Sequence, residues 1–174
     1  RAGVAFVQAE ILGVDSQRQH LLLHERPSLR FGVLSLDVGA VTRNADDLPG
    51  VPIKPLETAL QFLSQQDPHD PEPFRIVGAG PAGIEVALAL RRRWPHRALE
   101  LQTRTGQLNA TTRAILHRAQ IQCVTDPSDQ PTLLCTGSRA PSWLADSGFA
   151  VDHDGRVLTN PFLQLEGYPH LFAS

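Results

Sequence analysis

Three glycines between an apolar strand and an apolar-periodic helix constrain this chain more than any other feature. Gly78, Gly80 and Gly83 follow the apolar run 74–77 with the spacing G-x-G-x-x-G, and Pro81 stands where a helix should begin. In such a turn the first glycine allows a tight bend, the second lets the backbone approach a pyrophosphate, and the third lets the helix pack on the strand. The helix N-terminus adds free N–H groups and a positive dipole.

This turn predicts a dinucleotide-binding site. The residues expected to contact the pyrophosphate are Gly78, Ala79, Gly80, Pro81, Ala82 and Gly83. The alternative is a glycine turn that only packs a helix tightly against a strand. The helix that follows should end at the basic cluster 91–93, whose positive charges complement the helix dipole.

The segments after this helix alternate between strand and helix patterns. We expect strands at 98–103, 121–124 and 132–137, and a helix at 111–119. A β-α-β-α-β order implies a parallel sheet with right-handed crossovers. The sequence therefore predicts an α/β fold, with a three-layer, Rossmann-like nucleotide-binding domain over 74–140.

The flanking segments have a different pattern. Residues 3–38 contain short apolar runs separated by polar turns, which indicates an antiparallel meander. A helix is predicted from about Pro55, and the proline-rich stretch 67–73 ends it. We therefore divide the chain into 1–50, a crossover at 51–73, the nucleotide domain at 74–140 and a return segment at 141–174.

Composition excludes several classes of protein. The 174 residues are 41% hydrophobic, and their formal net charge is −2 with no long basic run, so nothing favours nucleic-acid binding. No apolar run is long enough to span a membrane, and no signal peptide is recognised. Cys123 and Cys135 each lie in an apolar run, which predicts buried, reduced thiols in a cytoplasmic protein. Because the chain starts at Arg1 and ends on an apolar run, we interpret it as a segment of a longer protein.

Other chemistries find little support in the sequence. The histidines show no spacing with cysteine or aspartate typical of a metal site, and the cluster Asp152, His153 and Asp154 lies within one turn. No G-x-S-x-G elbow is present, and the glycine turn lacks the Gly-Lys-Ser/Thr ending of a P-loop. We therefore predict no catalytic side chain and no metal.

Taken in order, several segments resemble the pyridine nucleotide-disulfide oxidoreductase family. Within it, the chain is similar to NADH dehydrogenase-like flavoproteins, including the flavoprotein domain fused ahead of some selenide, water dikinases. The matching segments are 34–40, 51–55, 78–85, 134–141, 155–160 and 169–173. The resemblance thus extends almost from end to end.

The resemblance implies FAD in the first domain and NAD(P)H in the second, with hydride transfer between them. It places Glu85 near the nicotinamide side of the cleft, although a first-turn carboxylate favoured by the helix dipole explains Glu85 equally well. It places Thr136 and Gly137 where the chain crosses between domains, near both cofactors.

The chain also departs from the family pattern. Nothing before residue 74 supplies the family's first glycine turn, and the chain stops at Ser174, before the family's Gly-Asp pair; the chain alone should therefore hold FAD poorly. A short turn at 126–131 stands where the family inserts a three-stranded meander. At the end of the second strand, Thr103 and Arg104 stand where the family usually has an acidic ribose ligand; Glu100 is the alternative acidic residue if the strand ends earlier. Thr103 and Arg104 would tolerate or attract a 2′-phosphate, which favours NADP over NAD.

Two functions remain at this point. The first is a fragment of an FAD-dependent NAD(P)H oxidoreductase, inactive in isolation, that transfers hydride to flavin and then to an unknown electron acceptor. The second is a degenerate, non-catalytic module that binds a nucleotide or a partner, such as a selenide, water dikinase. The sequence leaves a homo-oligomeric state open.

Overall fold

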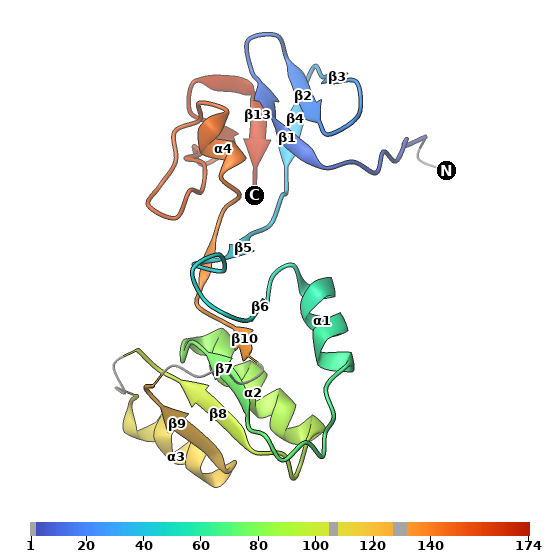
Figure 1. Cartoon of the computed structure of the whole chain (residues 1–174). Coiled ribbons are helices and arrows are strands. Elements are labelled where there is room, and N and C mark those ends of the chain that lie inside the picture. The colour runs from blue at the N-terminus through green and yellow to red at the C-terminus, as the bar shows by residue number, and fades with distance from the viewer. Residues whose placement is uncertain (1–2, 105–107, 127–131) are drawn as a thin grey trace. The chain divides into compact units, whose positions relative to one another are not determined.

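A computed structural model describes residues 3–104, 108–126 and 132–174 (Figure 1). The chain forms two compact units. Unit 1 comprises Arg1–Gly39 and Arg139–Ser174, and unit 2 comprises Ala40–Ser138. Strands β5 (Val41–Thr42) and β11 (Ser138–Arg139) form a two-stranded sheet where the chain passes from one unit to the other.

Unit 2 is built on a five-stranded, all-parallel sheet with the strand order β6-β10-β7-β8-β9. Its strands are β6 (Val51–Pro52), β7 (Phe74–Val77), β8 (Leu99–Gln102), β9 (Ile121–Val124) and β10 (Thr132–Leu134). Its helices are α1 (Leu56–Ser64), α2 (Pro81–Arg93) and α3 (Ala110–Arg118). The predicted α/β class and parallel sheet are confirmed, and each predicted helix is present within one or two residues of its expected bounds.

Local sequence explains where these helices begin. Pro81 occupies the first turn of α2, where a missing N–H costs no hydrogen bond. Asn109 caps α3, because its side chain accepts a hydrogen bond from the Thr112 N–H at 2.8 Å. Helix α1 follows Pro55 directly.

All three helices pack on one face of the sheet. Phe74 and Ile76 point to this face and are fully buried, whereas Arg75 between them points to the other. One continuous core unites this face with the three helices; its buried members are Ala59, Leu63, Phe74, Ile76, Ala87, Leu90, Trp94, Leu99, Leu101, Leu116, Ile121, Leu133 and Cys135.

The described part of unit 2 therefore has two layers, and the prediction of a three-layer domain is wrong for it. A third layer would need a helix on the face that carries Arg75, and no described residue between β9 and β10 is helical. Most of the turn predicted at 126–131 lies outside the described residues.

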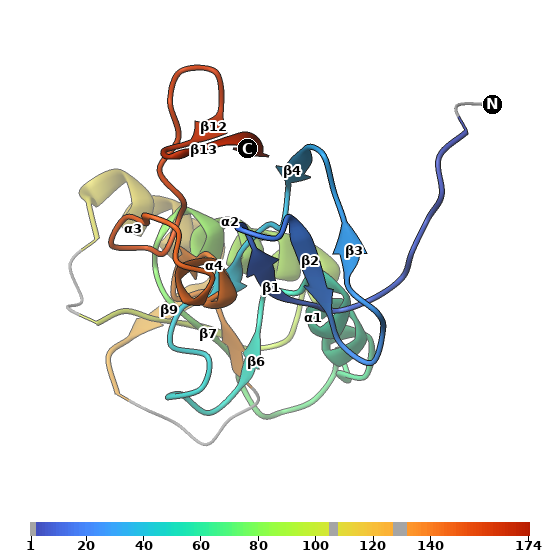
Figure 2. The same cartoon turned by 90° about the horizontal axis from the view of Figure 1, so that it is seen from above.

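Unit 1 contains two small sheets and one short helix. Strands β1 (Ile11–Asp15), β2 (His20–Leu23) and β3 (Leu29–Arg30) form an antiparallel meander over part of the predicted range 3–38. The prediction is wrong for the end of that range, because the strand at 34–36 joins a different sheet. Strand β4 (Leu34–Leu36) pairs in parallel with β13 (Tyr168–Ala173), which pairs antiparallel with β12 (Gln164–Leu165), as Figure 2 shows from above. Helix α4 (Trp143–Asp146) packs near β1, and the Ser147 hydroxyl accepts a hydrogen bond from the Val14 N–H at 2.9 Å.

Two local predictions are wrong. The apolar run 4–7 forms no strand, and Val4 and Phe6 are 84% and 89% exposed because no described segment pairs with it. Cys123 is exposed rather than buried, because it lies on β9, the edge strand of the larger sheet. Cys135 is buried, as predicted.

Candidate functional site

The glycine turn joins β7 to α2 in a conformation that only glycine tolerates at its first position. Gly78 has φ +109°, and a Cβ there would overlap the carbonyl group of Cys135. The Gly78 N–H donates to the Gln102 carbonyl oxygen at 3.0 Å, which holds the turn level with the end of β8. The fold itself therefore requires a glycine at this position.

Gly83 is also required by the fold. It is buried in the first turn of α2, and a Cβ there would overlap the carbonyl oxygen of Gly78. Removing the side chain lets α2 lie directly on the turn, as the G-x-G-x-x-G pattern predicts.

Gly80 differs from these two glycines because nothing in the protein requires it. Its backbone angles, φ −74° and ψ 176°, suit any residue, and a Cβ there would meet no atom within 4 Å. It is the N-cap of α2, where Ser, Thr, Asp or Asn would each supply a side-chain hydrogen bond that this helix lacks. The space that a side chain would fill is open, and it adjoins the unpaired N–H groups of Ala82 and Gly83 in the first helical turn.

A hollow of about 590 Å³ opens at this turn, at the carboxyl edge of the sheet. Strand ends on both sides of β7 contribute to it. Its lining residues are Asn44, Leu48, Val77, Gly78, Ala79, Gly80, Pro81, Ala82, Gln102, Thr103, Arg104, Thr125, Cys135, Thr136 and Gly137. A cavity of this size suits a small-molecule ligand.

Nine of the eleven predicted cofactor contacts line this hollow. The two exceptions are Gly83, which is buried beneath the turn, and Glu85, which is exposed on α2 outside the lining. Contact of any of these residues with a nucleotide stays a prediction. The structure adds lining residues that were not predicted, among them Asn44, Gln102 and Thr125. Thr125 directly follows a parallel strand, so the rule that ligands bind at the carboxyl ends of strands could have found it.

The end of β8 lies beside the glycine turn. Thr103 is buried, and its N–H donates to the Val124 carbonyl oxygen at 2.9 Å. Arg104, the next residue, is exposed. Glu100 lies two residues before the end of β8 and forms an ion pair with Arg75, whose Nε donates to its Oε2 at 2.9 Å.

Two residues after β10 close the other side of the hollow. The Thr136 hydroxyl donates to the carbonyl oxygen of Arg43, and the Arg43 N–H donates to the Gly137 carbonyl oxygen at 3.0 Å. Gly137 has φ +97°. Cys135 lies at the base of the hollow, and burial raises the pKa of its thiol to about 11, so the thiol is protonated at neutral pH.

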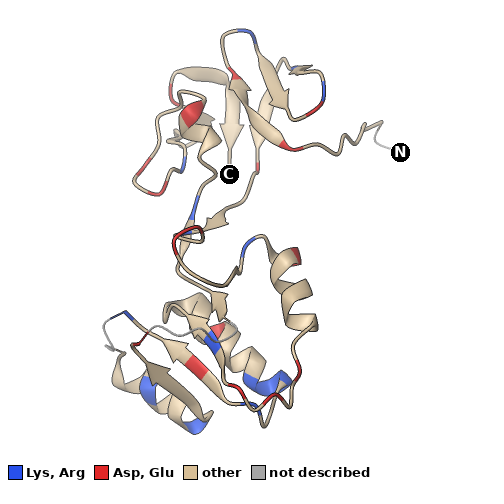
Figure 3. Ribbon diagram, in the orientation of Figure 1, with Lys and Arg blue, Asp and Glu red and all other residues tan. Residues whose placement is uncertain are grey.

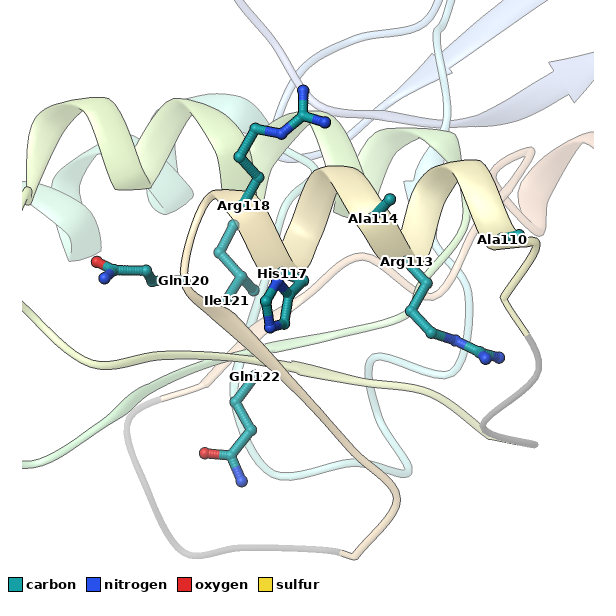
Figure 4. A pocket seen from close by; sticks show the side chains of 8 residues that line it. All are labelled: Ala110, Arg113, Ala114, His117, Arg118, Gln120, Ile121 and Gln122. Carbon is teal, nitrogen blue, oxygen red and sulfur yellow. The ribbon is translucent and has the colours of Figure 1, made fainter.

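A second hollow, of about 1040 Å³, lies between α3 and β9 (Figure 4). Its lining residues are Ala110, Arg113, Ala114, His117, Arg118, Gln120, Ile121 and Gln122. Arg113 and His117 point toward the side of β9, whereas Arg118 points away (Figure 4). The basic residues of α3 and of the last turn of α2 are visible in Figure 3. The lining contains no carboxylate that could act with His117 as an acid–base pair, so we place the candidate site at the glycine turn.

Residues 3–104, 108–126 and 132–174 contain no group of three or more His, Cys, Asp or Glu side chains arranged to hold a metal ion. None of the helices there has the length and apolar character needed to cross a membrane.

Comparison with known proteins shows which structures share this fold. No family model matches the chain. Ferroptosis suppressor protein 1 of Taeniopygia guttata is 22% identical over 213 residues, covering 98% of this chain and 56% of that protein. Reduced CoADR-RHD of Bacillus anthracis superposes with a TM-score of 0.77 at 16% identity, covering 95% of this chain and 36% of the other. The NADH-bound water-forming NADH oxidase of Lactobacillus brevis gives 0.76 at 16% identity, covering 94% and 44%.

These likenesses establish the fold. The structural neighbours are members of the pyridine nucleotide-disulfide oxidoreductase family, so the fold implied by the sequence resemblance is confirmed. The chain spans little more than half of the first of these relatives and less than half of the two solved structures.

Proposed function

We infer that unit 2 binds the pyrophosphate of a nicotinamide dinucleotide at the turn from Gly78 to Ala82. The observation that supports this most directly is the open space at Gly80. Gly78 and Gly83 are glycines because the protein's own atoms leave no room for a side chain, but Gly80 faces a hollow at a helix N-terminus. At a helix N-terminus beside a hollow, a glycine that the fold does not need fits a ligand that approaches the backbone closely.

The residues around Gly80 fit a dinucleotide. The N–H groups of Ala82 and Gly83 lack intrahelical partners, and they lie at the positive end of the α2 dipole, which favours a phosphate. Thr136 and Gly137 are fixed by their hydrogen bonds to Arg43, so they form a rigid opposite wall. In this proposal the nucleotide supplies a hydride, and the protein positions it.

The whole protein is, in our proposal, an FAD-dependent NAD(P)H oxidoreductase that reduces an acceptor not yet identified. The fold likeness supports this general kind of reaction. The described residues of unit 1 do not themselves fit FAD, because they contain no glycine turn leading into a helix. We therefore derive no step through the flavin from this chain. A cytoplasmic location stays a prediction.

Replacing Gly80 tests the nucleotide site. Gly80→Val should lower the affinity for NADPH and NADH at least tenfold, because its side chain would occupy the space left for the pyrophosphate. Isothermal titration calorimetry of the full chain measures both affinities. Gly32→Val is the matched control, since Gly32 in unit 1 also faces open space.

The outcomes separate the two functions. Retained affinity in folded Gly80→Val would contradict binding at this turn. If the folded wild-type chain binds neither nucleotide, the non-catalytic module becomes the better description. Thermal melting should show that both variants fold as the wild type does, since a Cβ at either position meets no atom of the protein within 4 Å.

A further inference from the structure

We propose that the carboxyl ends of β8 and β9 form a 2′-phosphate subsite, so that this chain selects NADP(H) over NAD(H). The inference rests on the proposed function and specifies the ligand of the same hollow. Its residues are Thr103 and Arg104, which follow β8, and Thr125, which follows β9. All three line the hollow that opens at the glycine turn.

A site that selects NAD places an Asp or Glu at the end of the second strand, where it binds the ribose 2′-hydroxyl and repels a 2′-phosphate. Glu100 is the one carboxylate on β8, and it cannot fill that role. It lies within the strand, and two nitrogens of Arg75, Nε and Nη2, donate to its Oε2. Its side chain is 15% exposed.

The described aspartates next in sequence to the lining residues of the hollow do not line it themselves. The part of the chain that the structure describes places Asp126 just after Thr125, and Asp46 and Asp47 in the loop between Asn44 and Leu48. None of these three aspartates lines the hollow. The carbonyl oxygen of Asp126 accepts a hydrogen bond from Arg75 Nη1, which fixes its backbone on the face of the sheet opposite the helices.

Hydrogen-bond donors follow β8 and β9 where a carboxylate would select NAD. Arg104 is exposed, permanently charged, and able to donate two parallel hydrogen bonds to a phosphate. Thr103 and Thr125 follow adjacent parallel strands and line the same hollow, and the Thr103 N–H bonds to the carbonyl oxygen of Val124, immediately before Thr125. Hydroxyl and guanidinium groups without a carboxylate form a donor set that suits a phosphate monoester.

Titration of the full chain with NADPH and NADH in parallel tests the subsite. We expect NADPH to bind about tenfold or more tightly at low ionic strength, as a charge-assisted phosphate contact would give. This preference should shrink as salt is raised, because an exposed ion pair is screened. Arg104→Gln should remove most of the preference by weakening NADPH alone, and Arg104→Lys should restore part of it. Arg92→Gln, at the exposed opposite end of α2, is the matched control and should change neither affinity.

Each result is decisive. Equal affinities for both nucleotides would overturn the subsite but leave the proposed function intact. A preference for NADPH that survives Arg104→Gln would overturn the role of Arg104. Absence of binding by either nucleotide to a folded chain would remove the proposed function together with the subsite.

Discussion

The amino and carboxyl edges of the parallel sheet in unit 2 differ in how the connecting segments are arranged. At the amino edge, where β7, β8 and β9 begin, two arginines bond the connecting segments to one another. At the carboxyl edge, the segments after β7, β8, β9 and β10 surround a hollow. The comparison shows which part of the domain stabilises the fold and which part is free to bind a ligand.

Arg91 joins two segments at the amino edge. Its guanidinium donates to the carbonyl oxygens of Ala119 and Gln120 before β9, and to those of Trp94, Pro95 and Arg97 before β8, at 2.9–3.1 Å. Burial lowers the pKa of this guanidinium. The sequence had suggested only that the cluster 91–93 complements the helix dipole; for Arg91 the structure adds these five bonds.

Arg97 joins the segment before β8 to the segment before β7. Its side chain is fully buried, with the guanidinium 5.3 Å from the ring centre of Phe74 and 5.2 Å from that of Trp94. It donates to the carbonyl oxygen of Asp67 at 2.8 Å and to the carboxylate of Asp70 at 3.1 Å. The amino edge therefore leaves few polar groups for a ligand. At the carboxyl edge, the N–H groups of Ala82 and Gly83 have no intrahelical partner.

The largest effect should come from breaking the amino edge. Arg97→Met should lower the free energy of unfolding of unit 2 by about 3–4 kcal/mol, because it removes a fully buried guanidinium's ion pair with Asp70, its hydrogen bond to the Asp67 carbonyl oxygen and both cation–π contacts. Urea denaturation followed by Trp94 fluorescence, with Trp143 replaced by Phe, measures this change. Arg93→Met, an exposed arginine at the same edge, is the control and should shift the midpoint little. Equal shifts for both variants would show that Arg97 does not stabilise this edge.

A smaller loss should follow from crowding the glycine turn. Gly78→Ala should cost about 2–3 kcal/mol, since it combines a positive φ with overlap against the Cys135 carbonyl. Gly137→Ala is the control for strain alone: its φ is +97°, but a Cβ there meets only Arg43 Nε at 4.0 Å. The same denaturation assay should give about 1 kcal/mol for it. A Gly78→Ala loss no larger than the Gly137→Ala loss would mean that the turn relaxes around the new methyl group.

The smallest perturbation uses the native cysteines as reporters. With a pKa of about 11, only about one Cys135 thiol in a thousand is ionised at pH 8, and the thiolate is the reactive form. Iodoacetamide should therefore label exposed Cys123 much faster than Cys135 in the folded protein, as mass spectrometry of timed digests would show. Raising the pH from 8 to 9 should speed Cys135 labelling about tenfold if ionisation limits it. Rapid labelling of both thiols at pH 8 would contradict a closed base to the hollow.

Most of unit 2 could be predicted from the sequence because its signals are local. The spacing of Gly78, Gly80 and Gly83 predicts the turn, and the apolar periodicity of 81–93 predicts the helix, because each pattern depends on residues close in the sequence. The alternation of strand and helix patterns predicts the parallel sheet. The family resemblance pointed to Thr136 and Gly137, and the expected position of an acidic ribose ligand pointed to Thr103 and Arg104. All four line the hollow, and their contact with a nucleotide stays a prediction.

Other features could not be predicted because they depend on distant segments. Whether Glu100 can reach a ribose depends on Arg75, which lies 25 residues earlier and binds Glu100 from the neighbouring strand. The exposure of Cys123 depends on the order of strands, which makes β9 an edge. The run 4–7 has the composition of a strand, but a strand needs a neighbour, and none of the described segments pairs with it.

The Arg75–Glu100 ion pair has a consequence for how the sheet assembles. The two residues are directly opposite one another in the parallel ladder, on the face that carries no helix. Sliding β8 along β7 by one residue would place Arg75 against leucine and leave a buried guanidinium without its partner, a cost that apolar packing alone would not impose. We infer that the ion pair specifies the register between β7 and β8. Because it aligns Gln102 with Val77, just before the glycine turn, it also places the turn and the end of β8 beside the same hollow.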